Sequence, residues 1–201
     1  MTEFARIAGL LAGITSFASF LLYYISIVRG KTIPNRATWF ILTVVGTLIC
    51  TSYYSLGARD TIWIPVSYVI GPLITFLLSI KYGEGGWTNF DRWCLFGSGV
   101  SLFFWWLFDS ALLALLINIL IDLFGMLPTL RKSYLRKESE EPFPWLITFL
   151  SCMLNILAIE TWDFSIWIYP IYMLIINGAV FLLLYYPEKI RSLKLSLVPR
   201  V

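Results

Sequence analysis

The segment IWIPVSYVIGPLITFLLSIKYGE, residues 62–84, aligns without a gap with IWIYPIYMLIINGAVFLLLYYPE, residues 166–188. Seven of the 23 aligned positions are identical, among them the opening Ile-Trp-Ile, the pair Tyr68 and Tyr172, and the closing Tyr-x-Glu. Each segment is apolar over about 20 residues, the length at which a helix crosses a bilayer. The alignment therefore predicts that one kind of membrane helix occurs twice, once in each half of the chain.

Composition indicates that the rest of the chain lies in a membrane as well. Of its 201 residues, 59% are hydrophobic and only 13% are charged, whereas soluble domains carry about 25% charged residues. Apolar runs that are long enough to span a bilayer predict seven helices. These runs fall at residues 4–28, 36–56, 62–81, 92–108, 110–130, 143–160 and 165–186.

Lysine and arginine indicate the direction of these spans. With seven spans, 13 of the 15 basic residues fall on one side, and only Arg6 and Arg59 fall on the other. Because cytoplasmic loops carry an excess of Lys and Arg, we expect the N-terminus outside and the C-terminus inside, in a plasma (inner) membrane. The 13 residues are Arg29, Lys31, Arg36, Lys81, Arg92, Arg131, Lys132, Arg136, Lys137, Lys189, Arg191, Lys194 and Arg200.

The spans that precede the two aligned segments also correspond, since each begins with a tryptophan, Trp39 or Trp145. We therefore expect an all-α membrane protein with seven transmembrane helices in a 3+1+3 parallel-repeat arrangement. Residues 1–88 would form the first three-helix repeat, 89–109 the linker helix, 110–188 the second repeat and 189–201 a cytoplasmic C-terminal tail. Transporters with parallel repeats bind their solutes near the bilayer midplane, between the repeats.

Two short motifs extend this pattern. In GMLPTLRKSY, residues 125–134, Pro128 and Thr129 lie where the fifth span ends before a basic loop. In IINGAVFLLLYY, residues 175–186, Asn177 and Gly178 interrupt the apolar seventh span. Together with the 3+1+3 plan, these motifs resemble the PQ-loop superfamily, which includes the SWEET sugar transporters, the lysosomal cystine-type transporters and the KDEL receptors. Pro128 matches the proline of the family's Pro-Gln dipeptide, and Asn177 with Gly178 is similar to the Asn-Gly that lines the SWEET central pocket.

Asp122, in LLINILIDLFGMLPTLRK (residues 115–132), is the one acid of 12 that we expect deep inside an apolar span. No His and no central Lys or Arg is available to pair with it, and burial favours its protonated form. Because an acid within a membrane costs several kcal/mol, Asp122 is expected to couple transport to protons or to bind the solute. The alternative is a protonated Asp that is bonded to a neighbour such as an Asn. The expected solute-binding residues are Asn118, Asp122, Asn155, Tyr172 and Asn177.

Other polar and proline residues within the spans have simpler explanations. Ser and Thr commonly make helix–helix contacts in membranes, and packing is the favoured role for two polar stripes. The stripes contain Thr43, Thr47 and Thr51 in the second span and Thr148, Ser151 and Cys152 in the sixth. Asp109 with Ser110 is typical of a helix N-cap. Pro65 and Pro170 either kink their spans or lie in a first helical turn, where proline costs little.

The sequence carries no Gly-rich phosphate loop, no HExxH and no CxxC, and Cys50, Cys94 and Cys152 lack metal-type spacing. We therefore expect no enzyme, no catalytic residue, no cofactor, no metal and no nucleic-acid partner. The first hypothesis is a small-solute membrane transporter of the PQ-loop/SWEET type, linked to protons through Asp122. The second is a non-transporting receptor or scaffold of the same plan that binds a peptide or lipid. Both hypotheses leave open whether the chain forms a homo-oligomer in the bilayer.

Overall fold

The computed structural model describes residues 3–34, 36–83, 89–135 and 140–185, apart from the side chains of a few residues within two helices. These ranges contain seven helices and no strand, which confirms the all-α prediction. The helices begin and end within three residues of the predicted spans, except at the C-terminal end of α5. They are α1 (Glu3–Val28), α2 (Arg36–Ser55), α3 (Trp63–Tyr82), α4 (Asn89–Phe108), α5 (Ala111–Leu135), α6 (Pro142–Leu157) and α7 (Phe164–Tyr185).

Four of these helices, α1, α2, α3 and α7, are long and apolar enough to cross a membrane. The described apolar parts of the other three are shorter, at Leu95–Phe108 in α4, Ala111–Met126 in α5 and Pro142–Leu157 in α6. The length and composition of the helices therefore indicate a membrane protein.

Side chains are distributed as expected for a chain that is surrounded by hydrocarbon. Large apolar residues point outward, including Ile14, Leu77 and Trp106, whose exposed fractions are 65%, 55% and 78%. The interior contains hydroxyl groups instead, and those of Ser52 and Ser67 lie on residues with no exposed surface. An apolar outside around a partly polar inside places the polar groups where other helices, and not lipid, can satisfy them.

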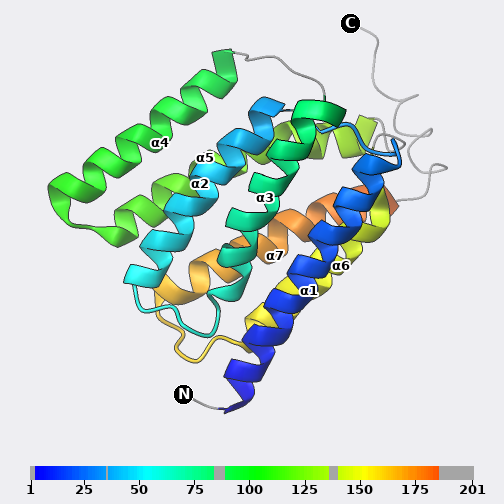
Figure 1. Ribbon diagram of the computed structural model, residues 1–201. Helices are drawn as coiled ribbons and strands as arrows, with labels where there is room; N and C mark the ends of the chain where they lie inside the picture. Colours follow the sequence, from blue (N-terminus) through cyan, green and yellow to red (C-terminus); the bar gives the residue numbers. More distant parts are fainter. Residues whose placement is uncertain (1–2, 35, 84–88, 136–139, 186–201) are drawn as a thin grey trace, which may run out of the picture.

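Six of the helices form two layers of three, with α4 at one edge (Figure 1). In one layer α3 packs between α1 and α2, and in the other α7 packs between α5 and α6. The layers meet where α1 packs on α6 and where α2 packs on α5. α4 packs on α5 and on α2, so it lies beside the two layers and takes no part in either.

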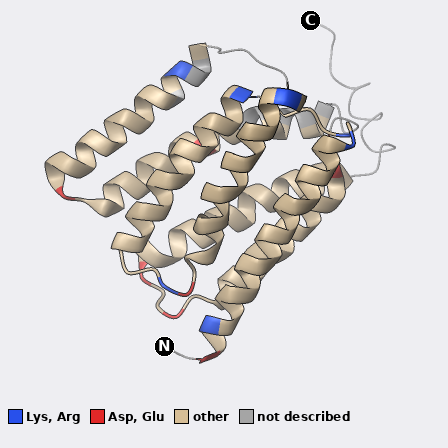
Figure 2. Ribbon diagram, viewed as in Figure 1, with Lys and Arg blue, Asp and Glu red and all other residues tan. Residues whose placement is uncertain are grey.

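Charged residues gather at the two ends of the bundle (Figure 2). Successive helices run in opposite directions, so the α1–α2 and α5–α6 connections lie at the same end (Figure 1). This basic end contains Arg29, Lys31, Arg36, Lys81 and Arg92. The opposite end contains Arg6 and Arg59 together with Asp60, Asp109, Glu160 and Asp163. The predicted segregation of charge thus holds for the described residues, while Arg136, Lys137 and the basic residues after 185 lie outside them.

Hydroxyl groups join the two layers along the α1–α6 contact. Thr148 of α6 donates a hydrogen bond to Ser19 of α1 at 2.9 Å, and Ser151 donates to the carbonyl of Ala12 at 2.9 Å. In α2, each of three threonines donates to the carbonyl four residues earlier in its own helix: Thr43, Thr47 and Thr51. The α6 stripe thus makes the helix–helix contacts that are the favoured interpretation. The α2 threonines bond within their own helix instead, and Thr47 and Thr51 are exposed.

The two prolines whose roles the sequence left open lie in different environments. Pro65 lies in the first turn of α3, whereas Pro170 lies inside α7. Because proline has no N–H, the carbonyl of Ile166 receives no hydrogen bond from position 170. The hydroxyl of Tyr53, on α2, donates to this carbonyl at 2.5 Å and is 2.7 Å from the Thr61 hydroxyl. α2 therefore supplies the hydrogen bond that Pro170 removes from α7.

Both ends of α5 differ from the sequence-based expectation. The helix does not end at Pro128 but continues to Leu135. Proline removes one backbone hydrogen bond, and neighbouring helices can hold the backbone on both sides of it. At the start of α5 the cap is Ser110 alone, whose Oγ accepts a hydrogen bond from the Leu113 N–H at 3.3 Å. Asp109 lies before the cap, in the turn, with a φ of 48°.

Candidate functional site

A cavity lies between the two layers, and every helix of both layers contributes to its wall. The volume of the cavity is about 60 Å³, which is room for a small solute. Five of the residues around it are aromatic, and one is an acid. The described residues that line it are Ser19, Phe20, Tyr23, Trp39, Leu42, Tyr68, Pro72, Asp122, Met126, Pro144, Trp145, Thr148, Met173, Ile176 and Asn177.

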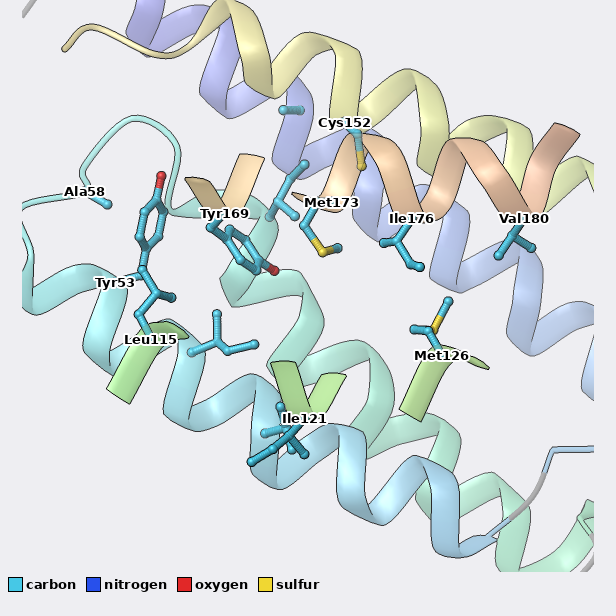
Figure 3. Packing of buried hydrophobic residues seen from close by; sticks show 14 of the residues in the cluster. Tyr53, Ala58, Leu115, Ile121, Met126, Cys152, Tyr169, Met173, Ile176 and Val180 are labelled. Carbon is cyan, nitrogen blue, oxygen red and sulfur yellow. The ribbon is translucent and has the colours of Figure 1, made fainter. Parts of the chain in front are cut away.

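This cavity lies in the half of the bundle that leads to the basic end. Its wall includes the C-terminal half of α1 and the N-terminal halves of α2 and α6, all of which are next to that end. In the other half the interior is closed, because the rings of Tyr53 and Tyr169 pack with centroids 5.4 Å apart. Figure 3 shows this pair at one end of the buried core and Met126, a lining residue, toward the other. This cavity therefore lies on the basic-end side of the Tyr53–Tyr169 pair, and neither tyrosine is among its described lining residues.

Asp122 is the acid of the cavity. The hydroxyl of Tyr172, on α7, donates to its Oδ2 at 2.5 Å. Its other oxygen, Oδ1, has no hydrogen-bond partner among the described residues. No Lys or Arg occurs among the described residues of the wall. Asp122 is thus bonded to a neighbouring side chain, as the alternative interpretation allows, with a tyrosine in place of an Asn, and one carboxylate oxygen remains for a proton or a solute.

Four other polar side chains of the wall are already paired within the protein. The Tyr68 hydroxyl donates to Oδ1 of Asn177 at 3.1 Å, and Nδ2 of Asn177 donates to the carbonyl of Met173 at 2.9 Å. Thr148 and Ser19 bond to each other, as described above. A solute in the cavity therefore meets few free hydrogen-bond acceptors besides Oδ1 of Asp122, whereas the unpaired Nε1 of Trp145 is a donor.

Aromatic rings contribute much of the remaining wall. Trp39 and Trp145, the residues that begin corresponding spans, both line the cavity. Leu42 and Thr148, three residues farther along each helix, line it too. The Nε1 of Trp145 is buried without a hydrogen-bond partner among the described residues. The two layers thus contribute to the wall through matching positions of α2 and α6.

Three of the five predicted site residues come together. Asp122 and Asn177 line the cavity, and Tyr172 contacts Asp122. Thr129, the residue in place of the family's Gln, lies in the same helix as Asp122 but is absent from the described wall.

The other two predicted site residues lie elsewhere. Asn118 turns toward α4, where its Nδ2 donates to Ser101 Oγ at 2.6 Å as well as to the Ala114 carbonyl at 2.8 Å. Asn155 is fully buried near the end of α6, and neither of its amide atoms has a hydrogen-bond partner among the described residues. Contact of Asn118 and Asn155 with a solute stays a prediction.

A second cavity lies at the opposite end, between the α2–α3 and α6–α7 connections, and Asp60 and Glu160 both line it. Asp60 is only 6% exposed, and its Oδ2 has no hydrogen-bond partner among the described residues. Burial raises the pKa of Asp60, and the negative charge and hydrogen bond of Glu160 raise it further, against the opposing effect of Arg6. The closed end of the bundle thus holds two carboxyl groups in contact.

Asp60→Asn is expected to stabilise the protein at neutral pH. Because the folded-state pKa of Asp60 lies above its unfolded value, its contribution to stability is fully present below about pH 4 and is lost as the pH rises through the folded-state pKa. The amide of Asn stays neutral, so we expect a melting temperature about 2–4 °C higher at pH 8, the shift that ~1 kcal/mol produces in a chain of this size. Thermal unfolding in detergent at pH 4 and pH 8 measures this, and an equal shift at both values would contradict it.

At the basic end, an ion pair joins the α1–α2 connection to the start of α6. Nζ of Lys31 lies 2.9 Å from Oε1 of Glu141. Hydrogen bonds from Lys31 and Ser26 lower the pKa of Glu141, outweighing the effect of its partial burial. Both side chains are partly exposed, so the pair contributes little to stability, but it links the two layers beside the cavity.

Comparison of the chain with protein-family models, with curated proteins and with solved structures finds no match.

Proposed function

We propose that this protein is a small-solute membrane transporter of two three-helix units around one cavity, with Asp122 as its proton-linked group. One observation carries the proposal. The cavity lies between the two layers, contains the one acid of its described wall, and is closed toward one end by Tyr53 and Tyr169. A site between two units that is reached from one end at a time is what alternating access requires.

Helix packing supports the two units. In the proposed repeat, α1, α2 and α3 correspond to α5, α6 and α7. α3 packs between α1 and α2, just as α7 packs between α5 and α6. The α1–α6 contact likewise corresponds to the α5–α2 contact. α4 stands outside both layers, as a linker between the units would. The proposed plan is thus the 3+1+3 parallel repeat of the PQ-loop and SWEET resemblance, with units at residues 1–88 and 110–188 and the linker at 89–109.

The distribution of charge supports an orientation. We place the basic end in the cytoplasm and the N-terminus outside a plasma (inner) membrane, because cytoplasmic loops carry the excess of Lys and Arg. In this orientation the described conformation has its cavity on the cytoplasmic side and its closed half on the outer side. α4, α5 and α6 would then also span the bilayer, which completes seven spans.

The transport cycle requires the closed half to open while the cavity closes behind the solute. On the outer side, the bond from Tyr53 to the Ile166 carbonyl and the contact of Asp60 with Glu160 connect the two units and would have to separate. On the inner side, the units can stay joined through Lys31 and Glu141.

The test asks from which side of the membrane the cavity is reached. Leu42→Cys, in a chain whose three cysteines are replaced by Ala, places a thiol on the cavity wall. We expect a membrane-impermeant, anionic methanethiosulfonate to label it in right-side-out and in inside-out vesicles. Ile33→Cys, in the α1–α2 connection, is the control that should react from the basic end only, and Ile14→Cys, on the lipid-facing surface, should react from neither.

Labelling of Leu42→Cys from the basic end alone would favour the second hypothesis, a non-transporting receptor or scaffold with a cavity open on one side. Absence of labelling from both sides would also contradict transport, because the cavity would then have no path to water. Labelling from both sides separates a transporter from these outcomes without knowledge of the solute.

A further inference from the structure

We propose that the cavity selects a small organic cation with an apolar body, and that this cation and a proton compete for Asp122. The inference rests on the proposed function and deepens it, because it names the class of solute that the same cavity would bind and the way in which the proton is coupled to it.

The first argument is the charge of the cavity. Asp122 lines it, no described lining residue is a Lys or Arg, and Oδ1 of Asp122 has no hydrogen-bond partner among the described residues. Arg36, one turn before Trp39, is occupied elsewhere, since its guanidinium reaches the carbonyls of Ser79 and Ile80 at 3.4 and 3.3 Å. An ionised carboxylate in an apolar surrounding requires a positive partner, and within this wall the solute is the group that can supply it.

The second argument is the aromatic wall around the acid. Phe20 and Tyr68 meet edge to face with centroids 5.3 Å apart, and Tyr23 and Trp39 pack with centroids 5.3 Å apart. The faces of aromatic rings attract cations, most strongly where water is excluded, and such cages recognise quaternary ammonium groups. A wall of rings with one carboxylate therefore suits a cation whose charge is spread over carbon-bound hydrogen atoms.

The third argument excludes other solutes. A sugar presents many hydroxyl groups, and the described wall has few free acceptors for them besides Asp122, because Tyr68, Asn177, Ser19 and Thr148 bond within the protein. An amino acid would also bring a carboxylate, which needs a cationic partner that the described wall lacks. A metal ion needs several oxygen ligands, and the described residues contain no group of three or more acidic, His or Cys side chains that could hold one.

Competition with a proton follows from there being one acid. With no solute the carboxyl can be protonated and neutral, and the Tyr172 hydroxyl still bonds to it. When the cation binds, the O–H bond of Asp122 breaks and the proton leaves for water, so the cavity is neutral in both states. One cation would then move one way for each proton that moves the other way, and the exchange carries no net charge.

The titratable groups that surround Asp122 on the neighbouring helices carry no charge that could balance the charge of its carboxylate. Those that titrate are hydroxyls and thiols, which are neutral at physiological pH. Described charged groups lie at the basic end, among them Arg36 and Arg92 in the first turns of α2 and α4, and Glu140, whose charge acts on Tyr23. The titratable neighbours are Tyr169 and Tyr172 on α7, Tyr68 on α3, Tyr23 on α1, Cys50 on α2 and Cys152 on α6.

The test compares two probes of the same shape. Choline carries a trimethylammonium group, and 3,3-dimethylbutan-1-ol is its neutral isostere, with carbon in place of nitrogen. Titration calorimetry of the full chain in detergent should detect choline binding at least tenfold tighter than the isostere. Choline binding should also release about one proton at a pH where Asp122 is protonated, measured from the heat in two buffers with different ionisation enthalpies.

Trp39→Leu should weaken choline binding about tenfold or more, because it removes one ring of the cage. Trp106→Leu is the matched control: this residue is 78% exposed on α4, far from the cavity wall, and should leave binding unchanged. A melting temperature for both variants shows whether they fold. Should Trp39→Leu fail to fold, Tyr23→Leu, on a different helix, serves as the second test of the cage.

Equal binding of choline and its isostere, tighter binding of glucose than of choline, or choline binding without release of a proton would each overturn the inference. These outcomes differ from a failure of the proposed function. Choline binding in detergent with proton release, but labelling of Leu42→Cys from one side only, would support the cation site and reject transport.

Discussion

Asp122→Asn is expected to abolish the exchange of cation for proton while leaving the fold intact. The amide has the shape of the carboxyl and can still accept the Tyr172 hydroxyl, but it can neither release a proton nor balance a cation. Truncating one partner of a buried charge pair costs about 2–5 kcal/mol, so choline affinity should fall roughly 30-fold or more. Vesicles that contain the wild-type protein, loaded with choline and diluted into choline-free buffer, should acidify inside. Vesicles with Asp122→Asn should not.

The control for this experiment is Asp109→Asn, the same chemical change at an exposed acid in the α4–α5 turn, outside the cavity. Its positive φ is one that Asn adopts readily, so it should acidify vesicles at the wild-type rate. Acidification by Asp122→Asn at that rate would exclude Asp122 as the exchange group. Loss of exchange together with a large drop in melting temperature would show instead that the acid holds the helices together.

The helices were predictable because of the membrane itself. In a bilayer each backbone N–H and C=O must be paired within its own segment, so a long apolar run has helix as its one stable conformation. The bounds of α1, α2 and α3 therefore follow the apolar runs closely. The end of α5 does not, because a basic and polar segment outside the apolar run can continue a helix, and Pro128 does not stop it.

Asp122 could be predicted as a site residue, and much of its surrounding could not. An acid in an apolar span costs free energy, so it indicates a functional site even when no other residue of the site is known. A tryptophan in a membrane segment has no such signal, because interfacial belts use the same residue. Trp39 and Trp145 were recognised as markers of the repeat, but it is the packing of α2 and α6 that brings both to one cavity.

Asn118 shows the limit of helical spacing. It lies four residues before Asp122 and shares its helix face, so the two were expected to share a site. α5 packs on α2, α4 and α7, and the neighbour changes from one turn to the next. Asp122 meets Tyr172 of α7, whereas Asn118 meets Ser101 of α4. Sequence periodicity gives the face of a helix but does not say which helix will cover it at each level.

The proposed repeat would also explain why the described wall of the cavity has a single charged side chain. Tyr68 and Tyr172 occupy aligned positions in the two segments that first indicated the fold. Tyr172 donates its hydroxyl to Asp122, while the ring of Tyr68 packs edge to face on Phe20. Within the proposed repeat, one tyrosine of the pair thus contacts a phenyl ring of α1 and the other contacts a carboxyl group of α5. An acid in one unit alone would leave the cavity one site for one cation or one proton.

Asn155→Leu is expected to stabilise the protein, although it removes a residue that was predicted to bind the solute. Asn155 lies ten residues after Trp145, and its counterpart ten residues after Trp39 is Ile49, which is 3% exposed. The buried amide of Asn155 has no hydrogen-bond partner among the described residues. A buried polar group without a partner lowers the free energy of unfolding by about 1–3 kcal/mol. Its removal should raise the melting temperature by several degrees, since ~1 kcal/mol corresponds to roughly 2–4 °C in a chain of this size.

The same variant should slow cation–proton exchange. The unpaired amide of Asn155 lowers the stability of the closed half, so its presence needs an explanation. A solute that bonds to this amide when the closed half opens to the outside would supply one. Asn118→Leu is the matched control with the opposite sign: Nδ2 of Asn118 makes two hydrogen bonds, although its Oδ1 makes none among the described residues, so the loss of both bonds should lower the melting temperature. A lower melting temperature for Asn155→Leu would show that the amide is satisfied in the resting protein. A higher one with unchanged exchange would remove Asn155 from the solute path and leave Asp122, Asn177 and the aromatic cage as the site.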